Sequence, residues 1–392
     1  MKTHVQTLAA KLLSVILLVG LTACEHNGES EPPALAHRTI LVYMVANNDL
    51  GSYGYDDADL NEMLHAAQTG GLNGGRLIVY HAPYHKAPAL KEITTEGIVE
   101  LKCYDNDILS VSASRMKQVI ADTKSIAQAD DYGIILWSHA SGWLQNGIDE
   151  TQTVPFITPR SEASPHAYGS ENNKCMNITT LAKVLEGEDF EFVYCDCCYM
   201  ANIEVAYELR NATQYIVGSA TELPADGMRY DLNIPVLMQN GTPDLVQTAR
   251  NTYMHYSNQP LSINQTCTMS VIYTAALDEL AATTRDIYAS GASFSPEYKP
   301  QPFELGSECR YFDFETYVKA FDTDSELQNK WSDAMDKAVL YKVNTPMIWG
   351  RLELRNHCGL STYPLSAPAQ ATDYGYSELQ WFQDVASNLK HR

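Results

Sequence analysis

The sequence predicts an α/β protein in which a mainly parallel sheet is covered by helices on both faces. Three apolar runs rich in branched residues, at 38–46, 76–81 and 132–138, are typical of buried parallel strands. Two stretches between them, at 57–67 and 110–127, carry apolar residues at helical spacing. Strands that alternate with helices indicate parallel pairing through crossover connections.

The alternation continues into the middle of the chain. Residues 191–195 and 215–219 are predicted as the fourth and fifth strands, and 179–185 and 200–210 as the helices beside them. In open parallel sheets, reactive groups gather beyond the carboxyl ends of the strands. We therefore look for chemistry just after the third, fourth and fifth strands.

The last third of the chain favours helices. Amphipathic stretches occur at 245–256, 277–288 and 324–337. A late strand is predicted near 359–366. We expect one domain at 38–243 and a helical C-terminal subdomain at 244–392 that packs on that domain and completes it.

The first 23 residues have the features of a signal peptide. The basic residues Lys2 and Lys11 precede an apolar run at 12–21, and small residues follow that run. The segment ending in Cys24 resembles a bacterial lipobox, which predicts lipidation of Cys24 and a flexible tether at 24–37. The protein is then an exported, membrane-anchored lipoprotein of a bacterial envelope, and the acidic tether favours the outer-membrane surface. A plain signal peptide with an incidental Cys24 is the alternative.

The acidic composition excludes one class of partner. The 392 residues carry a formal charge of −21, and loss of Lys2 and Lys11 with the leader makes it −23. Nucleic-acid binding rests on phosphate neutralisation by basic residues, so we expect no nucleic-acid partner. The charge suits cationic partners, although solubility alone also explains it.

His139 directly follows the third strand, in the segment WSHASGW. A ring at the end of a buried strand, followed by small residues, is well placed to act as an acid or base. The competing interpretation is a structural or merely exposed histidine.

Three cysteines lie at the end of the fourth strand and just after it, in VYCDCCYM. Cys198 is predicted to lie within about two residues of the next helix, where the helix dipole favours the thiolate. Cys195 and Cys197 fit small buried residues. A zinc site made of these three thiols and His139 is disfavoured, because C-x-C-C is a poor knuckle and alternate strand residues face opposite ways.

The order of these motifs resembles the clostripain family of clan CD cysteine peptidases. A strand followed by His-x-Ser-Gly-Trp precedes, some 60 residues later, a strand followed by Asp-x-Cys-x-Met and then NIEVAYEL. The similarity extends to VYMVANNDL, GSATELPADGMRYD, YFDFETY and GLSTYP, and so spans most of the mature chain. The resemblance implies a caspase-like α/β/α sandwich, with 38–243 as its catalytic domain.

The resemblance assigns roles to individual residues. It implies Cys198 as nucleophile and His139 as its partner, without an obligatory third member. It also implies an oxyanion site made by the backbone amides of Ala140 and Cys198. The family usually has Gly where this chain has Ala140. If that position needs a positive φ, Ala140 strains the turn and lowers the activity. The alternative function is therefore a catalytically inactive surface lipoprotein that binds basic peptides.

The resemblance also implies cleavage after Arg or Lys in polypeptide substrates, by a monomer that requires no cofactor. Carboxylates hold such side chains, and the candidates are Asp196, Asp226 and, as a substitute, Glu222. Solvated surface carboxylates are the bland alternative for each. Calcium use is left open, because the sequence has no D-x-D-x-D-G loop.

The segment 146–176 between the two motifs is rich in Pro, Ser, Asn and Gly and is predicted to be an exposed loop. Clan relatives are often cut between these motifs as they mature. Arg160 and Lys174 are therefore the candidate sites of autocleavage.

Overall fold

The computed structural model describes residues 35–144, 167–172, 174–295, 298–305, 309–365 and 375–389, and the chain from Leu35 onward is one compact unit. The predicted leader, Cys24 and nearly all of the tether lie outside the described residues. Within the described part, no helix has the length and apolar character needed to cross a membrane.

The core of the unit is a sheet that runs in the order β12-β10-β9-β8-β5-β1-β2-β3-β4. Its parallel centre consists of the five predicted strands, which are β1 (Ala36–Val45), β2 (Arg76–Ala82), β5 (Ala129–Trp137), β8 (Phe190–Asp196) and β9 (Thr213–Gly218). Antiparallel strands flank this centre, namely β3 (Ala89–Thr94), β4 (Gly97–Cys103), β10 (Thr268–Tyr273) and β12 (Val339–Asn344). The predicted mainly parallel sheet is confirmed, and its antiparallel edges are an addition.

Strand β1 shows why these runs are continuously apolar. Ile40, Val42 and Met44 pack into the core on one face of the sheet, whereas Leu41 and Tyr43 pack into the core on the other. Successive side chains of a strand point to opposite faces, so a strand covered on both sides needs apolar residues at every position.

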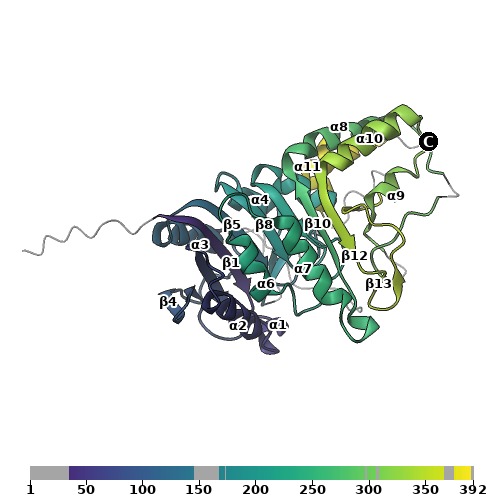
Figure 1. Cartoon of the computed structure of the whole chain (residues 1–392). Helices are drawn as coiled ribbons and strands as arrows, with labels where there is room; N and C mark the ends of the chain where they lie inside the picture. Colours follow the sequence, from purple (N-terminus) through teal and green to yellow (C-terminus); the bar gives the residue numbers. More distant parts are fainter. Residues whose placement is uncertain are drawn as a thin grey trace, which may run out of the picture. The chain divides into compact units, whose positions relative to one another are not determined.

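Helices cover both faces. One face carries α2 (Tyr55–Gln68), α6 (Tyr230–Leu237) and α7 (Leu245–Ser257). The other carries α3 (Ala113–Ile126), α4 (Ile178–Leu185), α5 (Ile203–Glu208), α8 (Leu277–Ala289), α10 (Ser325–Ala338) and α11 (Gln380–Asp384). Figure 1 shows α8 and α10 side by side next to the β10–β12 end of the sheet. The α/β/α sandwich expected from the sequence is therefore present.

The C-terminal third contributes more than helices. Its strands β10 and β12 extend the central sheet, and the short strands β11 (Phe312–Asp313) and β15 (Ser361–Thr362) pair with each other. Buried Glu204 of α5 accepts hydrogen bonds from Thr362, Tyr363 and Tyr376. The two predicted segments thus share one sheet and one core, and the division at residue 243 stays a prediction.

Candidate active site

Neighbouring parallel strands bring the two candidate catalytic residues to one edge of the sheet. In the pairing of β5 with β8, Trp137 lies opposite Asp196, the last residue of each strand. His139 and Cys198 each follow two residues later, so they leave adjacent strands at the same level. A shared carboxyl edge is where parallel sheets carry their reactive groups.

His139 has a direct acidic partner that the sequence did not indicate. Its Nε2 lies 2.7 Å from Oδ1 of Asp49, and about a third of the His139 side chain is exposed. Asp49 opens the short helix α1 (Asp49–Ser52), which follows β1. The turn-forming residues 47–49 after the first strand indicate only where that strand ends, and they give no sign of this contact.

The helix-dipole argument for Cys198 is wrong. Helix α5 begins only at Ile203, with Asn202 as its N-cap, because a turn through Tyr199 at φ 59° comes between. The Cys198 sulfur instead accepts a hydrogen bond from the Leu223 N–H at 3.3 Å and donates to the Leu223 carbonyl at 3.6 Å. Burial raises the pKa of the Cys198 thiol to about 12. The half-buried Cys198 side chain is therefore held by the Leu223 backbone in surroundings that favour the thiol over the thiolate.

The two neighbouring cysteines pack inward. Cys195 and Cys197 are both buried in the core on the face of the sheet that α5 covers. Cys195 lies in β8 and Cys197 just beyond its end, and both side chains pack into the same core cluster. The prediction that they are small buried residues is confirmed.

Ala140 does not carry the strain that the sequence suggested. It is absent from the described residues with positive φ, and Gly142 takes that conformation instead, at φ 70°. Ala140 lies opposite Tyr168 in an antiparallel bridge, and the flanking bonds use the His139 carbonyl and the Ser141 N–H. Neither bond uses the Ala140 N–H. The position tolerates alanine, because its backbone conformation is open to any residue.

Asp196 is buried beneath the loop that follows β9. Its carboxylate accepts hydrogen bonds from the Met228 N–H and the Tyr230 hydroxyl, both at 2.9 Å. Burial raises its pKa to about 7. A Cβ on Gly227, at φ 58°, would lie 2.7 Å from Asp196 Oδ2, so the loop can approach the carboxylate this closely only with glycine there.

The other two acidic candidates lie in different surroundings. Asp226 is exposed, in the same loop as Gly227. The Glu222 carboxylate accepts a hydrogen bond from the Trp349 indole N–H, and its charge contributes, after burial, to the raised pKa of Cys198. The loop therefore places Asp226 near Asp196, whereas the charge of Glu222 helps to raise the pKa of the Cys198 thiol.

Helix α2 adds two carboxylates that the sequence analysis missed. Asp59 accepts a hydrogen bond from the Trp137 indole at 2.6 Å, and burial, followed by the charge of Asp196, raises its pKa well above the usual range. Glu62 accepts from the Tyr230 N–H and pairs with Arg229 at 3.0 Å. We call Asp59, Glu62, Asp196 and Asp226 the acidic cluster. Its signal was the i, i+3 spacing of Asp59 and Glu62 on one helix face.

A two-stranded hairpin packs against the loop that carries His139. Strands β6 (Tyr168–Glu171) and β7 (Lys174–Met176) pair with each other, and the Gly169 N–H donates to the His139 carbonyl at 2.9 Å. The expectation of an exposed loop up to residue 176 is thus wrong for 168–172 and 174–176, where Tyr168 and Met176 are buried. Lys174 lies in β7 opposite Glu171, and Arg160 lies outside the described residues.

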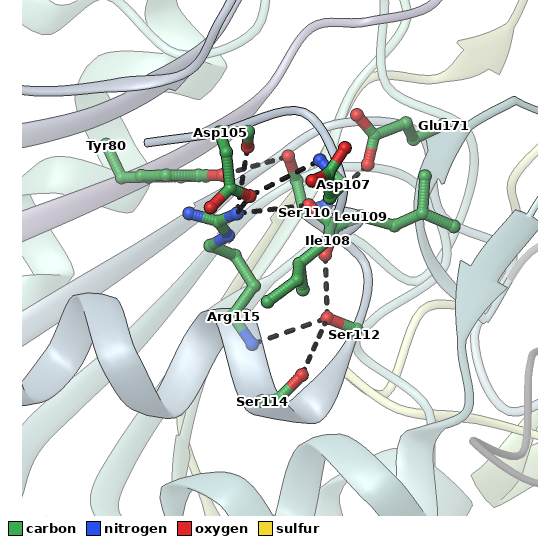
Figure 2. A network of polar contacts seen from close by, with 10 residues as sticks. All are labelled: Tyr80, Asp105, Asp107, Ile108, Leu109, Ser110, Ser112, Ser114, Arg115 and Glu171. Atoms are coloured by element: carbon green, nitrogen blue, oxygen red, sulfur yellow. Dashed lines mark hydrogen bonds and ion pairs between the residues drawn. The ribbon is translucent and has the colours of Figure 1, made fainter. Parts of the chain in front are cut away.

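Glu171 fixes this hairpin to the body of the protein. Figure 2 shows its carboxylate directed at the backbone N–H of Ser110, and its second oxygen accepts from the Asn47 side chain at 3.2 Å. In the same network the Arg115 guanidinium donates to the carbonyl and carboxylate of Asp105. The hairpin is held in place by buried polar contacts on two sides.

Comparisons with known proteins agree with this architecture. A family model described as the clostripain family matches residues 42–344. No curated protein matches the chain.

Solved structures extend the comparison. The inactive zymogen of a C11 protease from Parabacteroides distasonis is 29% identical, with a TM-score of 0.75 over 91% of this chain and 99% of that one. A secreted C11 cysteine protease from Bacteroides thetaiotaomicron, solved with an irreversible peptide inhibitor, is 27% identical, with a TM-score of 0.73 over 89% and 99%. A further structure of a secreted C11 cysteine protease from that organism is 21% identical, with a TM-score of 0.77 over 90% of this chain and 99% of that one, and it supports the fold.

Proposed function

The chain belongs to the clostripain family and is a cysteine peptidase, and we propose that it cleaves polypeptides after Arg and Lys with Cys198 as nucleophile and His139 as acid and base. The observation that carries the proposal is the shared register of β5 and β8, from which the two side chains emerge at one level. The carboxylates beside that edge support the choice of basic substrates.

The chemistry requires both side chains. Cys198 gives its proton to neutral His139, and the thiolate attacks the scissile carbonyl carbon. The resulting oxyanion would accept hydrogen bonds from the backbone N–H groups of Ala140 and Cys198. When the C–N bond breaks, protonated His139 supplies the proton that the leaving amine needs. Water, deprotonated by His139, then attacks the thioester, and the C–S bond breaks to release the acid and the thiol.

The acidic cluster is the proposed site for the P1 side chain. Its members, Asp59, Glu62, Asp196 and Asp226, interact electrostatically with one another. A guanidinium or ammonium entering among carboxylates stabilises their charged forms and gains charge-assisted hydrogen bonds. Asp196 is the expected principal partner because it directly precedes the cysteine segment on β8.

The covered thiol indicates how the activity is controlled. The Cys198 sulfur is hydrogen-bonded to the Leu223 backbone, and the pKa of its thiol is raised. Cys198 is therefore a poor nucleophile in this state. We propose that autocleavage, at Arg160 or Lys174, converts the chain into the competent form. Intact mass spectrometry of the wild type beside Cys198→Ala tests this step, because only the wild type should become two chains.

The same observation also favours the second candidate function, an inactive lipoprotein that binds basic peptides. A hydrolysis assay separates the two. The chain from residue 25 onward, under reducing conditions, is offered fluorogenic peptides ending in Arg, Lys, Asp, Asn or Leu, with and without calcium. Cys198→Ala is the test variant and exposed Cys103→Ala its matched control. We expect turnover confined to Arg and Lys, lost in Cys198→Ala and kept in Cys103→Ala. No turnover, even after limited trypsin treatment, favours the binding protein.

For the location of the enzyme, we propose export and anchoring through a lipid on Cys24. The signal-like segment and lipobox-like residues support this, and the negative charge agrees with an extracytoplasmic protease of cationic peptides. Incorporation of radiolabelled palmitate into the wild type but not into Cys24→Ala is the expected result. Equal labelling of the wild type and Cys24→Ala, or no labelling of either, would contradict lipidation of Cys24.

A further inference from the structure

We propose that Asp49 is a positioning residue for His139, so that the reaction uses a third side chain beyond the proposed pair. The inference rests on the proposed function, since it needs His139 as the acid and base. It starts from the 2.7 Å contact between Asp49 Oδ1 and His139 Nε2.

The placement of Asp49 is built into the fold. Its neighbour Asn48 caps α1 by accepting the Leu50 N–H at 2.9 Å. The Asn48 amide donates to the Val45 carbonyl at 3.0 Å and contacts the Ser138 hydroxyl at 3.3 Å. Ser138 immediately precedes His139, and its own hydroxyl donates to the Val45 carbonyl at 2.8 Å. The residues preceding the acid and the histidine are therefore hydrogen-bonded to each other.

Two further hydrogen bonds join these residues to the hairpin. The Asn48 amide donates to the Ser170 carbonyl at 2.8 Å, and the Ser170 N–H donates to the Ser138 hydroxyl at 3.2 Å. Asn48 and Ser138 thus share a partner in β6. These hydrogen bonds tie together the segments that carry Asn48, Ser138 and Ser170. The Asp49 carboxylate therefore meets the His139 ring in one fixed geometry.

The contact fixes which ring nitrogen works on the substrate. An ionised carboxylate only accepts hydrogen bonds, so Nε2 must carry a proton when it faces Asp49. The other nitrogen, Nδ1, is then the one that takes the proton from the Cys198 thiol and delivers it to the leaving amine. The task of Asp49 is to hold the ring and select the tautomer.

The exposure of the pair sets the size of the effect. About a third of the His139 side chain and 65% of the Asp49 side chain are exposed, so solvent screens the attraction and the orientation of the ring dominates. General acid–base catalysis contributes about 100- to 10,000-fold, and loss of the orienting group should cost part of it, about 10- to 100-fold in kcat. KM should change less than about twofold, because Asp49 is placed to act through His139 and not on the substrate.

The kinetic test compares Asp49→Ala, Asp49→Asn and Asp49→Glu with the wild type on an Arg substrate. Exposed Asp57→Asn, on the neighbouring α2, is the matched control and should keep wild-type kinetics. We expect the loss to fall on kcat in Asp49→Ala and Asp49→Asn, with partial recovery in Asp49→Glu, which keeps an accepting carboxylate. Wild-type kcat in Asp49→Ala, or a loss in KM alone, would overturn the assignment.

A spectroscopic readout makes the test independent of turnover. In ¹⁵N-histidine-labelled Cys198→Ala protein, with His139 assigned by comparison with His139→Gln, the neutral ring should be the Nε2–H tautomer. Adding Asp49→Ala should give a mixture of tautomers. The same single tautomer with and without Asp49 would refute the positioning role. If the wild type cleaves no peptide, the proposed peptidase function fails, while this arm still decides the contact.

Discussion

Replacing Asp196 by Asn should remove much of the fall in stability that the wild-type protein shows between pH 5 and pH 8. The wild-type carboxyl has a pKa raised to about 7 by burial, against about 4 in an unfolded chain. The unfolded state therefore ionises first as the pH rises, and the folded state is progressively disfavoured. The native contribution is complete below pH 4 and is lost as the pH rises to and through 7.

The magnitude follows from the linkage relation. Between pH 5 and pH 8 the unfolded carboxyl is almost fully ionised, whereas the folded one changes from nearly neutral to mostly charged. Integration over this window gives a loss of about 3 kcal/mol from Asp196 in the wild type. An amide does not titrate, so Asp196→Asn should lack this component. The lost acceptor for Tyr230 or Met228 costs the same at both pH values and cancels in the difference.

Urea denaturation at pH 5 and pH 8, in a Cys198→Ala background that prevents self-cleavage, measures the effect. The Asp226→Asn variant serves as control, since it removes an exposed carboxylate from the loop that covers Asp196. If Asp196→Asn loses as much stability as its parent between the two pH values, the buried titration does not exist as described.

Three further predictions follow from single contacts. Gly142→Ala should destabilise the protein by about 2 to 5 kcal/mol in urea denaturation, because its φ of 70° is left-handed and the new Cβ would lie 2.7 Å from the Tyr311 hydroxyl; a change below 1 kcal/mol would contradict this. Glu222→Gln should speed iodoacetamide alkylation of Cys198 at pH 8 about threefold, since after burial its charge helps raise the thiol pKa; an unchanged rate would exclude that influence. Glu204→Ala should cost about 3 kcal/mol in the same denaturation assay because it strands three buried or half-buried donors, and a neutral outcome would show that they find other partners.

The parallel centre of the sheet was predictable, and its edges were not. Strands β1, β2, β5, β8 and β9 are covered on both faces, so each contains a run of consecutive buried, mostly apolar residues, such as 40–45 in β1, 134–137 in β5 and 192–195 in β8. Strand β4 is largely exposed, and β12 alternates between half-buried and exposed residues, so neither carries a continuous apolar run. Edge strands are identified by their pairing partners, which a single sequence does not reveal.

The candidate site shows the same limit at the level of side chains. Strand ends located His139 and Cys198, since position along a strand is a local property. The contact of His139 with Asp49 joins residues 90 positions apart, and the neighbourhood of Asp59 and Asp196 depends on how α2 packs. The predicted helix start near Cys198 was wrong for a related reason, because the turn that delays α5 to Ile203 depends on long-range packing, and burial beside Leu223 raises the pKa of the thiol.

The place in the fold of the segment between the His139 and Cys198 motifs determines what a chain break there would do to the folded protein. Residues before it supply β5, and residues after it supply β8, which are adjacent in the sheet. The hairpin that follows the segment also pairs with the His139 loop. A nick within 145–166 would therefore divide the polypeptide without dividing the core. Two bands on a denaturing gel would correspond to one species on a sizing column, and the maturation event would be irreversible in its covalent chemistry yet leave no fragment free to diffuse away.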